Sequence, residues 1–436
     1  MSFWGVVIAV LGLGILAAAH EIGHFLAAKR LGIKVQELSI FVGPSLVHWN
    51  RNGVEYHIRL IPFGAYVRFP GFDEDDEGMT NPDSYLNQPR WKRLLVSLAG
   101  PFTNLILGIV IFAVISSIFG FTSTNLDIIT EGSQIAQTNA VEGDTIETLN
   151  GKRILTDVDL SYLAYSVPST DPMTMTLRSQ KTGQIYSVTL TPTIESRYVV
   201  GIQGIDRTDS DVNKGWEITT VDLTQNGGHP VLKIGDILLS INGISVTDPN
   251  VAAVTAGNES NQITVSIIRD GVKQDVSMTA TISDTANARG IYIKPGSGFG
   301  NLLKHSVLYS VSVIEVSIYG LRAVAKGEIK AQDAIGGPLG IASAVSGVVD
   351  APKTDNSVKV ETLGFLAGLI SVSLAFTNLL PLPGLDGNAV VLVAIEMIRG
   401  KKISIRTESI INGIGFVVLI ALVIFAFSSD ILRLVG

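Results

Sequence analysis

Residues 3–28 read FWGVVIAVLGLGILAAAHEIGHFLAA, an apolar run that is long enough to cross a membrane and that contains His20-Glu21-Ile22-Gly23-His24. On a helix, His-Glu-x-x-His places two imidazoles at i and i+4 on one face, where both can bind one zinc ion. Glu21 lies beside the first histidine and can accept the proton of an attacking water. A charged residue near the bilayer centre costs about 2.5–3.5 kcal/mol on insertion scales, so this cluster predicts a functional site. The alternative is a chance pentapeptide on a core helix.

The composition around this run is that of a membrane protein with soluble parts. The 436 residues are 46% hydrophobic and only 16% charged, and their mean hydropathy is +0.39. Segments of about 20 apolar residues are long enough to span a bilayer. They occur at about 4–26, 94–120, 361–382 and 409–427. The sequence therefore predicts a multi-span α-helical membrane protein with four transmembrane helices, the first of them retained rather than removed as a signal peptide.

Charge and cysteine content narrow the chemistry. The chain has no cysteine, which excludes disulfides and thiolate ligands, so any zinc must bind to histidine and carboxylate groups. The formal net charge of −7 offers no basic surface, and we expect no nucleic-acid partner. Cytoplasmic loops retain Lys and Arg. Basic residues gather between the first two spans and between the last two, at Lys29, Arg30, Lys34, Arg90, Lys92, Arg93, Arg399, Lys401, Lys402 and Arg406. Both loops are predicted to be cytoplasmic, which leaves both termini and the long central segment on the outer side.

Residues 55–68, EYHIRLIPFGAYVR, follow the first span and are rich in β-branched and aromatic residues. They predict a hairpin or short sheet against the membrane. Its functional interpretation is an edge that pairs with an extended substrate strand, and the alternative is a plain cytoplasmic hairpin.

Two segments of the central region echo one another, EGDTIETLNG at 142–151 and IGDILLSING at 234–243. Each predicts a strand that is entered through Gly-Asp and ends in an Asn-Gly turn. A helix-compatible stretch and two alternating strands follow each of them, at 173–177 with 185–190 and at 263–269 with 274–279. Two such copies predict two small, tandem β-rich domains between spans two and three. The pattern resembles PDZ domains, with a generic pair of β-sandwiches as the alternative.

The predicted boundaries follow from these patterns: 1–120 for a first membrane half, 121–197 and 198–285 for the two PDZ domains, 286–350 for a juxtamembrane helix and linker, and 351–436 for a second membrane half. Within the linker, residues 299–326 predict an amphipathic helix on the outer leaflet. A fifth span is the competing interpretation, made weaker by Glu315 and Arg322.

A catalytic zinc ion usually has three protein ligands, so two histidines need a partner. The third span ends in the sequence NLLPLPGLDG at 378–387, where Asp386 is the only carboxylate. Pro381 and Pro383 stop a helix from running through this stretch. An opened backbone would direct Asp386 towards the histidines, in a place covered by protein or lining a wet cavity. Alternatively, Asp386 only caps the next helix.

With these motifs in this order, nearly the whole chain resembles the site-2 protease family of intramembrane zinc metalloproteases. The resemblance implies that His20, His24 and Asp386 bind Zn²⁺ and that Glu21 is the general base. It also implies that Asn378, in the motif that contains Pro381 and Pro383, helps to hold the substrate. Residues 61–67 match the family's membrane-reentrant β segment, which makes Ile61, Phe63, Gly64 and Tyr66 substrate-binding candidates.

Gly100-Pro101 with Asn104 matches the second-span motif of the family. One departure is that many members have Gly-His after Leu-Asp-Gly, whereas this chain has Asn388-Ala389. The ligand set is intact, but any role of that downstream histidine is lost.

The function implied by the resemblance is a zinc endopeptidase of the bacterial inner membrane. Its partners would be the lipid bilayer and single-span substrates, such as a trimmed anti-sigma factor, together with remnant signal peptides. Periplasmic PDZ domains would gate substrate entry, and the active site would lie towards the cytoplasmic side. Two other classes stay open: a membrane-anchored PDZ scaffold with a vestigial metal site, and a metal transporter. Neither class needs Glu21, and a transporter does not need tandem PDZ domains.

Overall fold

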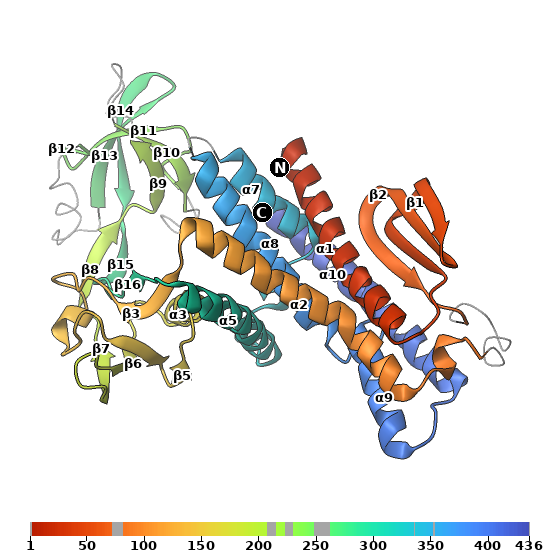
Figure 1. The fold of residues 1–436 in the computed structure, drawn as a ribbon. Helices are drawn as coiled ribbons and strands as arrows, with labels where there is room; N and C mark the ends of the chain where they lie inside the picture. Colours follow the sequence, from red (N-terminus) through yellow and green to blue (C-terminus); the bar gives the residue numbers. More distant parts are fainter. Residues whose placement is uncertain are drawn as a thin grey trace. The chain divides into compact units, whose positions relative to one another are not determined.

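The computed structural model describes residues 2–71, 82–206, 215–222, 230–247, 262–334, 336–351 and 354–435 (Figure 1). The chain forms two compact units. A helical unit comprises Met1–Thr124, Ile154–Tyr162 and Lys294–Gly436, and a β unit comprises Asn125–Arg153 and Leu163–Ile293.

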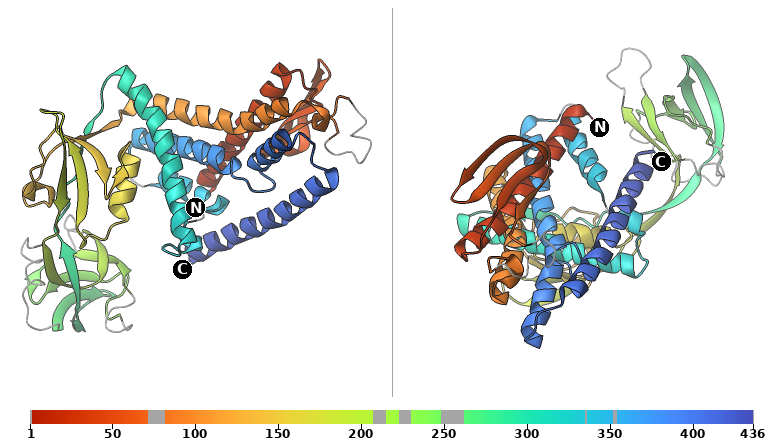
Figure 2. Two further views of the ribbon diagram at one scale, coloured as in Figure 1. Left: turned by 90° about the horizontal axis from the view of Figure 1, so that it is seen from below. Right: turned by 90° about the vertical axis from the view of Figure 1, so that its right-hand side faces the viewer.

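The helical unit is built around α2, which packs against α1, α5, α8 and α9 (Figures 1 and 2). Helix α7 packs against α1, and α10 packs against α6 and α7. Short 3-10 turns lie at Tyr85–Asn87 and Ile135–Gln137. The helices are α1 (Phe3–Arg30), α2 (Arg90–Phe119), α3 (Asp157–Tyr165), α5 (Phe299–Ala325), α6 (Ala331–Ala334), α7 (Pro338–Asp350), α8 (Asn356–Asn378), α9 (Asp386–Arg399) and α10 (Ile405–Val435).

Five helices of the described residues are long and apolar enough to cross a membrane: α1, α2, α5, α8 and the part of α10 at Gly413–Leu432. Four of them coincide with the predicted spans. The fifth, α5, is the helix that the sequence places on the outer leaflet. It meets the same criteria of length and composition although it carries Glu315 and Arg322. The predicted number of four spans is therefore not confirmed.

The predicted break after the third apolar segment is confirmed. Helix α8 ends at Asn378 and α9 begins at Asp386. Between them, Pro381 and Pro383 have no N–H group to continue a helix, and Gly384 has a φ of +93°, a backbone conformation that favours glycine. As a result, Asp386 stands at the start of a helix rather than inside one.

Strand structure at 55–68 is confirmed, but these residues form one strand, β2 (Val54–Arg68), and its hairpin partner is β1 (Glu37–Arg51), which the sequence did not predict. The two strands bend so far that residues 37–40 pair with 65–68 on one side and with 55–58 on the other, and 47–51 pair with 54–58. Positive φ angles at Phe41, Gly43 and Gly64 accompany these bends. Residues 65–68 thus form one edge of a small sheet, called here the edge segment.

Side chains alternate across this small sheet. On one face, Leu38, Tyr56 and Val67 join a core with Phe25 of α1 and Val96 of α2. This packing fixes the hairpin against the two helices, with β2 packed against α1.

The β unit contains most of two larger sheets. One has the order β14-β13-β11-β10-β9 with β12 on β11, the other has the order β16-β3-β4-β6-β7 with β5 on β4, and β8 pairs with β15. The strands are β3 (Thr122–Leu126), β4 (Thr145–Leu149), β5 (Lys152–Arg153), β6 (Met173–Arg178), β7 (Ile185–Leu190), β8 (Ile194–Val199), β9 (Ile202–Asp206), β10 (Trp216–Val221), β11 (Ile237–Ile241), β12 (Ile244–Ser245), β13 (Gln262–Arg269), β14 (Val272–Thr279), β15 (Thr281–Ala286) and β16 (Ile293–Pro295).

The two segments that echo one another adopt the same local structure. Asn150 and Asn242 have φ angles of 45° and 47°, and the side-chain oxygen of each accepts a hydrogen bond of 2.8 Å from a backbone N–H of the neighbouring strand. The aspartates of both Gly-Asp pairs are buried. The helix-compatible stretch expected between the second segment and residues 263–269 lies mostly outside the described residues. The assignment to PDZ domains and the domain boundaries stay predictions.

Candidate metal centre

Three candidate ligands from two helices that are far apart in the sequence meet in the helical unit. His20 and His24 lie one turn apart on α1, and Asp386 is the first residue of α9. The Oδ2 atom of Asp386 lies 2.9 Å from His20 Nε2 and 3.4 Å from His24 Nε2, and the two Nε2 atoms are 3.1 Å apart. Both imidazoles are buried, and the carboxylate is partly buried. The predicted approach of Asp386 to the histidines is confirmed.

The surroundings of these atoms suit a bound cation. His24 Nδ1 lies 2.7 Å from the carbonyl oxygen of Val96 in α2. With the proton on Nδ1 for that hydrogen bond, the Nε2 lone pair faces the Nε2 atom of His20 and the Asp386 carboxylate. The ligand atoms of His20, His24 and Asp386 all lie within 4.8 Å of one another, close enough for one cation to bind all three. Two imidazole nitrogens and one carboxylate oxygen are also a common donor set for catalytic zinc, so the residues fit that metal.

Helix α2 approaches the imidazoles so closely that it needs glycine at position 100. A methyl group built on Gly100 would lie 2.7 Å from His20 Nε2 and closer still to His24 Nε2. Both distances are shorter than van der Waals contact. The Gly100-Pro101 motif therefore has a physical reason, which is space for the two candidate ligands.

A cavity of about 580 Å³ opens beside this cluster and is lined by Glu21, His24 and Asp386. The backbone N–H of Val67, in the edge segment, interacts with the Glu21 carboxylate. The motif glutamate is therefore located where it can reach a water or a peptide bond in the cavity. The other lining residues are Tyr66, Arg68, Phe69, Tyr85, Val96, Ser97 and Ala389.

Of the hairpin residues predicted to bind substrate, only Tyr66 lines the cavity. Ile61 and Phe63 are exposed, and Gly64, with a φ of +80°, lies at a bend of the hairpin. None of these last three lines the cavity.

The predicted substrate residues of the third span also lie outside the cavity lining. Asn378 is the last residue of α8, and Pro381 and Pro383 lie in the connection to α9. Pro383 packs against Gly415 of α10. Binding of substrate by these residues stays a prediction.

Several lining residues were not identified from the sequence. Arg68 lies in the predicted segment 55–68 but was not selected as a site residue, and Phe69 follows it directly. Tyr85, Val96 and Ser97 belong to no motif, and only the packing of α2 against α1 and the hairpin brings them to the site.

Basic residues gather at the end of the helical unit where α1 ends and α2 begins. Lys92 Nζ donates a hydrogen bond of 2.7 Å to the carbonyl oxygen of Leu31, and Arg90 donates one of 2.9 Å to the carbonyl of Gly400. Lys402 donates one of 3.0 Å to the carbonyl of Leu86. The first and last loops, both rich in Lys and Arg, thus lie together at one end.

Comparison with known proteins gives similarities over the full length. Residues 8–422 match the family described as Peptidase family M50. A Haemophilus influenzae protein named Regulator of sigma E protease is 27% identical over 463 aligned residues, which cover all of both chains. A Vibrio cholerae protein and a Clostridium acetobutylicum protein, whose names both include the words "zinc metalloprotease", are 28% and 26% identical. The first alignment covers 99% of both chains, and the second covers 99% of this chain and 98% of the relative.

Proposed function

The chain belongs to peptidase family M50, the site-2 protease family, and on this premise we propose that this zinc metalloprotease cuts single-span membrane proteins within the lipid bilayer. The observation that carries the proposal is the meeting of His20, His24 and Asp386 beside a cavity that also contains Glu21. Two of these residues and the glutamate lie on α1, a helix long and apolar enough to cross a membrane.

The proposed roles follow from the placement of the side chains. His20, His24 and Asp386 hold the zinc ion, which when bound acts as a Lewis acid and makes water nucleophilic near neutral pH. Glu21 accepts the proton of the attacking water and passes it to the leaving amine.

A substrate helix hides its peptide bonds in internal hydrogen bonds, so it must be extended locally before it can be cut. The edge segment is suited to receive it. The carbonyl oxygen of Arg68 accepts a hydrogen bond of 2.9 Å from Gln36 N, and backbone groups alternate along a strand. Val67 therefore directs its N–H away from β1 and towards Glu21. An extended substrate that pairs with this edge would place its backbone beside the base.

The finer parts of the proposal concern substrates and topology. The name of the Haemophilus influenzae relative supports a trimmed anti-sigma factor as one substrate class, and remnant signal peptides are another. The clustered basic loops support a cytoplasmic position for that end of the helical unit in the inner membrane. The two sheets of the β unit would then be periplasmic PDZ domains that gate substrate entry.

A cleavage assay with a single-span protein in proteoliposomes tests the function. We expect the wild type to cut inside the apolar segment, as mapped by mass spectrometry. Glu21→Gln should retain zinc and lose about 10²–10⁴-fold in rate, the usual contribution of a general base. If Glu21→Gln cuts as fast as the wild type, the assignment of the base is wrong.

A further inference from the structure

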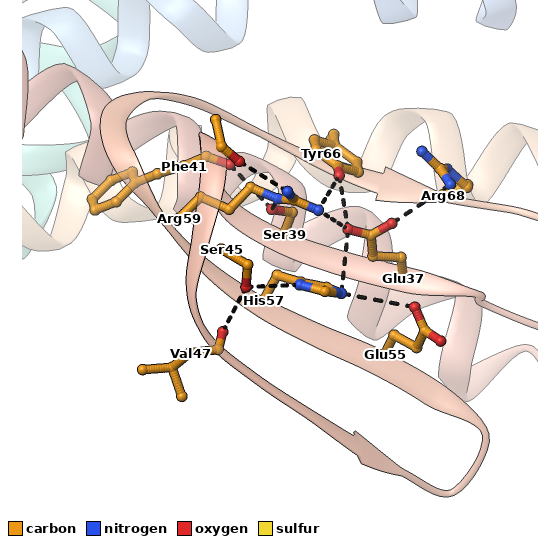
Figure 3. Close-up of polar contacts among 11 residues, drawn as sticks. Glu37, Ser39, Phe41, Ser45, Val47, Glu55, His57, Arg59, Tyr66 and Arg68 are labelled. Carbon is orange, nitrogen blue, oxygen red and sulfur yellow. Dashed lines mark hydrogen bonds and ion pairs between the residues drawn. The ribbon is translucent and has the colours of Figure 1, made fainter.

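The face of the hairpin opposite its apolar core carries a polar network that the proposed chemistry does not use (Figure 3). Its centre is the carboxylate of Glu37 in β1, a residue that is only 5% exposed. Glu37 Oε1 accepts hydrogen bonds of 2.7 Å from Tyr66 Oη and from Arg59 Nη2. His57 and Arg68 each place a nitrogen 3.7 Å from the same carboxylate.

Arg59 connects three parts of the folded hairpin. Besides Glu37, its Nη2 atom donates to Tyr66 Oη at 2.9 Å, and its Nε atom donates to Ser39 Oγ at 2.8 Å. Its Nη1 atom donates to the carbonyl oxygen of Gly43 at 2.9 Å, where the strand bends. The planar guanidinium thus makes contacts that a lysine could not make together.

The network acts on the edge segment. Ser39 and Glu37 of β1 are the register partners of Tyr66 and Arg68. Glu37 therefore contacts the edge side chains from the neighbouring strand, and Arg59 reaches Tyr66 from the other side of β1. Val67 lies between Tyr66 and Arg68, and its N–H interacts with Glu21. Tyr66 itself lines the cavity. The position of the edge relative to the base therefore depends on where this network holds Tyr66 and Arg68.

The charge state of Glu37 agrees with this arrangement. Burial alone would raise the pKa of Glu37, but hydrogen bonds from Tyr66 and Arg59, with the nearby His57 and Arg68, outweigh that effect and hold its pKa below the usual value. The carboxylate is thus charged at neutral pH, and each hydrogen bond that it accepts is charge-assisted.

We infer that Glu37 and Arg59 are positioning residues, which fix the edge segment 65–68 at the distance from Glu21 that an added substrate strand requires. This inference rests on the proposed cleavage of substrates paired with that edge. Glu37 and Arg59 touch neither the metal centre nor the cavity lining, except through Tyr66 and Arg68, so they act through these two residues.

Kinetics on a single-span substrate in detergent, with Glu37→Gln and Arg59→Lys, test the inference. We expect KM to rise about tenfold for each variant, the factor that corresponds to one charge-assisted hydrogen bond, while kcat and zinc content stay near the wild type. The double variant should be no worse than the worse single one, because both changes break one network. Tyr66→Phe removes only the hydroxyl from the network and should raise KM by a smaller factor.

Hydrogen exchange in the same proteins gives a readout that does not depend on cleavage. Glu37→Gln should speed exchange at the amides of 65–68 and leave 47–51, at the other edge of the sheet, unchanged. The matched control is Glu147→Gln, which breaks a Glu–Arg pair of 2.7 Å between two strands of the β unit. It should change neither KM nor exchange in the hairpin.

Two results would overturn the inference. One is an unchanged KM in Glu37→Gln and Arg59→Lys while the wild type cuts the substrate. The other is faster exchange throughout the hairpin together with loss of zinc, which would mean a general structural role. If the wild type cuts no single-span substrate, the proposed function fails, and the exchange at 65–68 still decides whether the network positions the edge.

Discussion

At the scale of residues, the metal centre depends on how closely the backbones of α1, α2 and α9 approach one another. His20 and His24 need only the i and i+4 spacing of a helix, which the sequence reveals directly. Asp386 needs a helix break, which Pro381 and Pro383 predict. The space that Gly100 leaves for the imidazoles is a property of helix packing, and the sequence offers only a motif match for it. The same holds for Tyr85, which no pattern connects with the cavity.

The glycine at position 100 gives a sharp prediction. Gly100→Ala places a methyl group against both imidazole Nε2 atoms, so the histidines must move away from Asp386. We expect the purified variant to contain little zinc and to lose activity in proportion, as measured by elemental analysis and cleavage.

The matched control for this variant is Gly12→Ala in α1, where a methyl group meets nothing within 4 Å. That variant should bind zinc as the wild type does. Full zinc occupancy in Gly100→Ala would show that the approach of α2 to the imidazoles is not as close as described.

At the scale of elements, α9 has to be held in register because its first residue is Asp386. A buried ion pair connects it to α2, with 2.9 Å between Arg93 Nη1 and Glu396 Oε2, and both residues are at most 5% exposed. Glu396 also accepts a hydrogen bond of 2.9 Å from the backbone N–H of Ile403. The sequence shows an arginine and a glutamate in separate segments but not that they meet, because such pairs form only on tertiary packing.

Loss of this pair should loosen α9. Arg93→Met leaves the buried Glu396 carboxylate without its closest cation, which costs about 3–5 kcal/mol of unfolding free energy. We expect a lower thermal midpoint in detergent and faster loss of zinc to a chelator. Arg178→Met, which breaks a half-exposed pair with Glu147, should cost at most about 1 kcal/mol. Equal effects of the two changes would contradict the role given to the α2–α9 pair.

In the β unit, the first Gly-Asp segment makes a testable pH prediction. Tyr186 donates a hydrogen bond to Asp144, and burial together with this bond to a carboxylate raises the pKa of Tyr186 to about 12. A phenol whose pKa is higher in the folded than in the unfolded state contributes stability that is complete below about pH 10 and is lost as the pH rises through 12. The difference in tyrosinate absorbance between the wild type and Tyr186→Phe should titrate near pH 12. Titration near pH 10 would contradict both the burial of Tyr186 and its bond to Asp144.

At the scale of the whole molecule, hydropathy predicts most of the helical unit because apolar runs of spanning length are rare in soluble proteins. It does not decide the case of α5, where Ser, Glu and Arg between apolar residues suit either a surface helix or a span. The similarity of the two Gly-Asp segments predicts two sheets with the same local structure, because the Asn-Gly turns dictate local backbone geometry. The folding of the hairpin onto itself was not predictable, since β1 has no alternating pattern as clear as that of β2.

The most direct measurement is zinc X-ray absorption spectroscopy on the purified full-length protein, with zinc stoichiometry determined on the same sample. One zinc ion per chain with two imidazole nitrogens and one carboxylate oxygen at about 2.0–2.2 Å is the predicted result, together with loss of the ion in Asp386→Ala and His24→Ala. Zinc that stays bound with an unchanged spectrum in both variants would contradict the proposed centre.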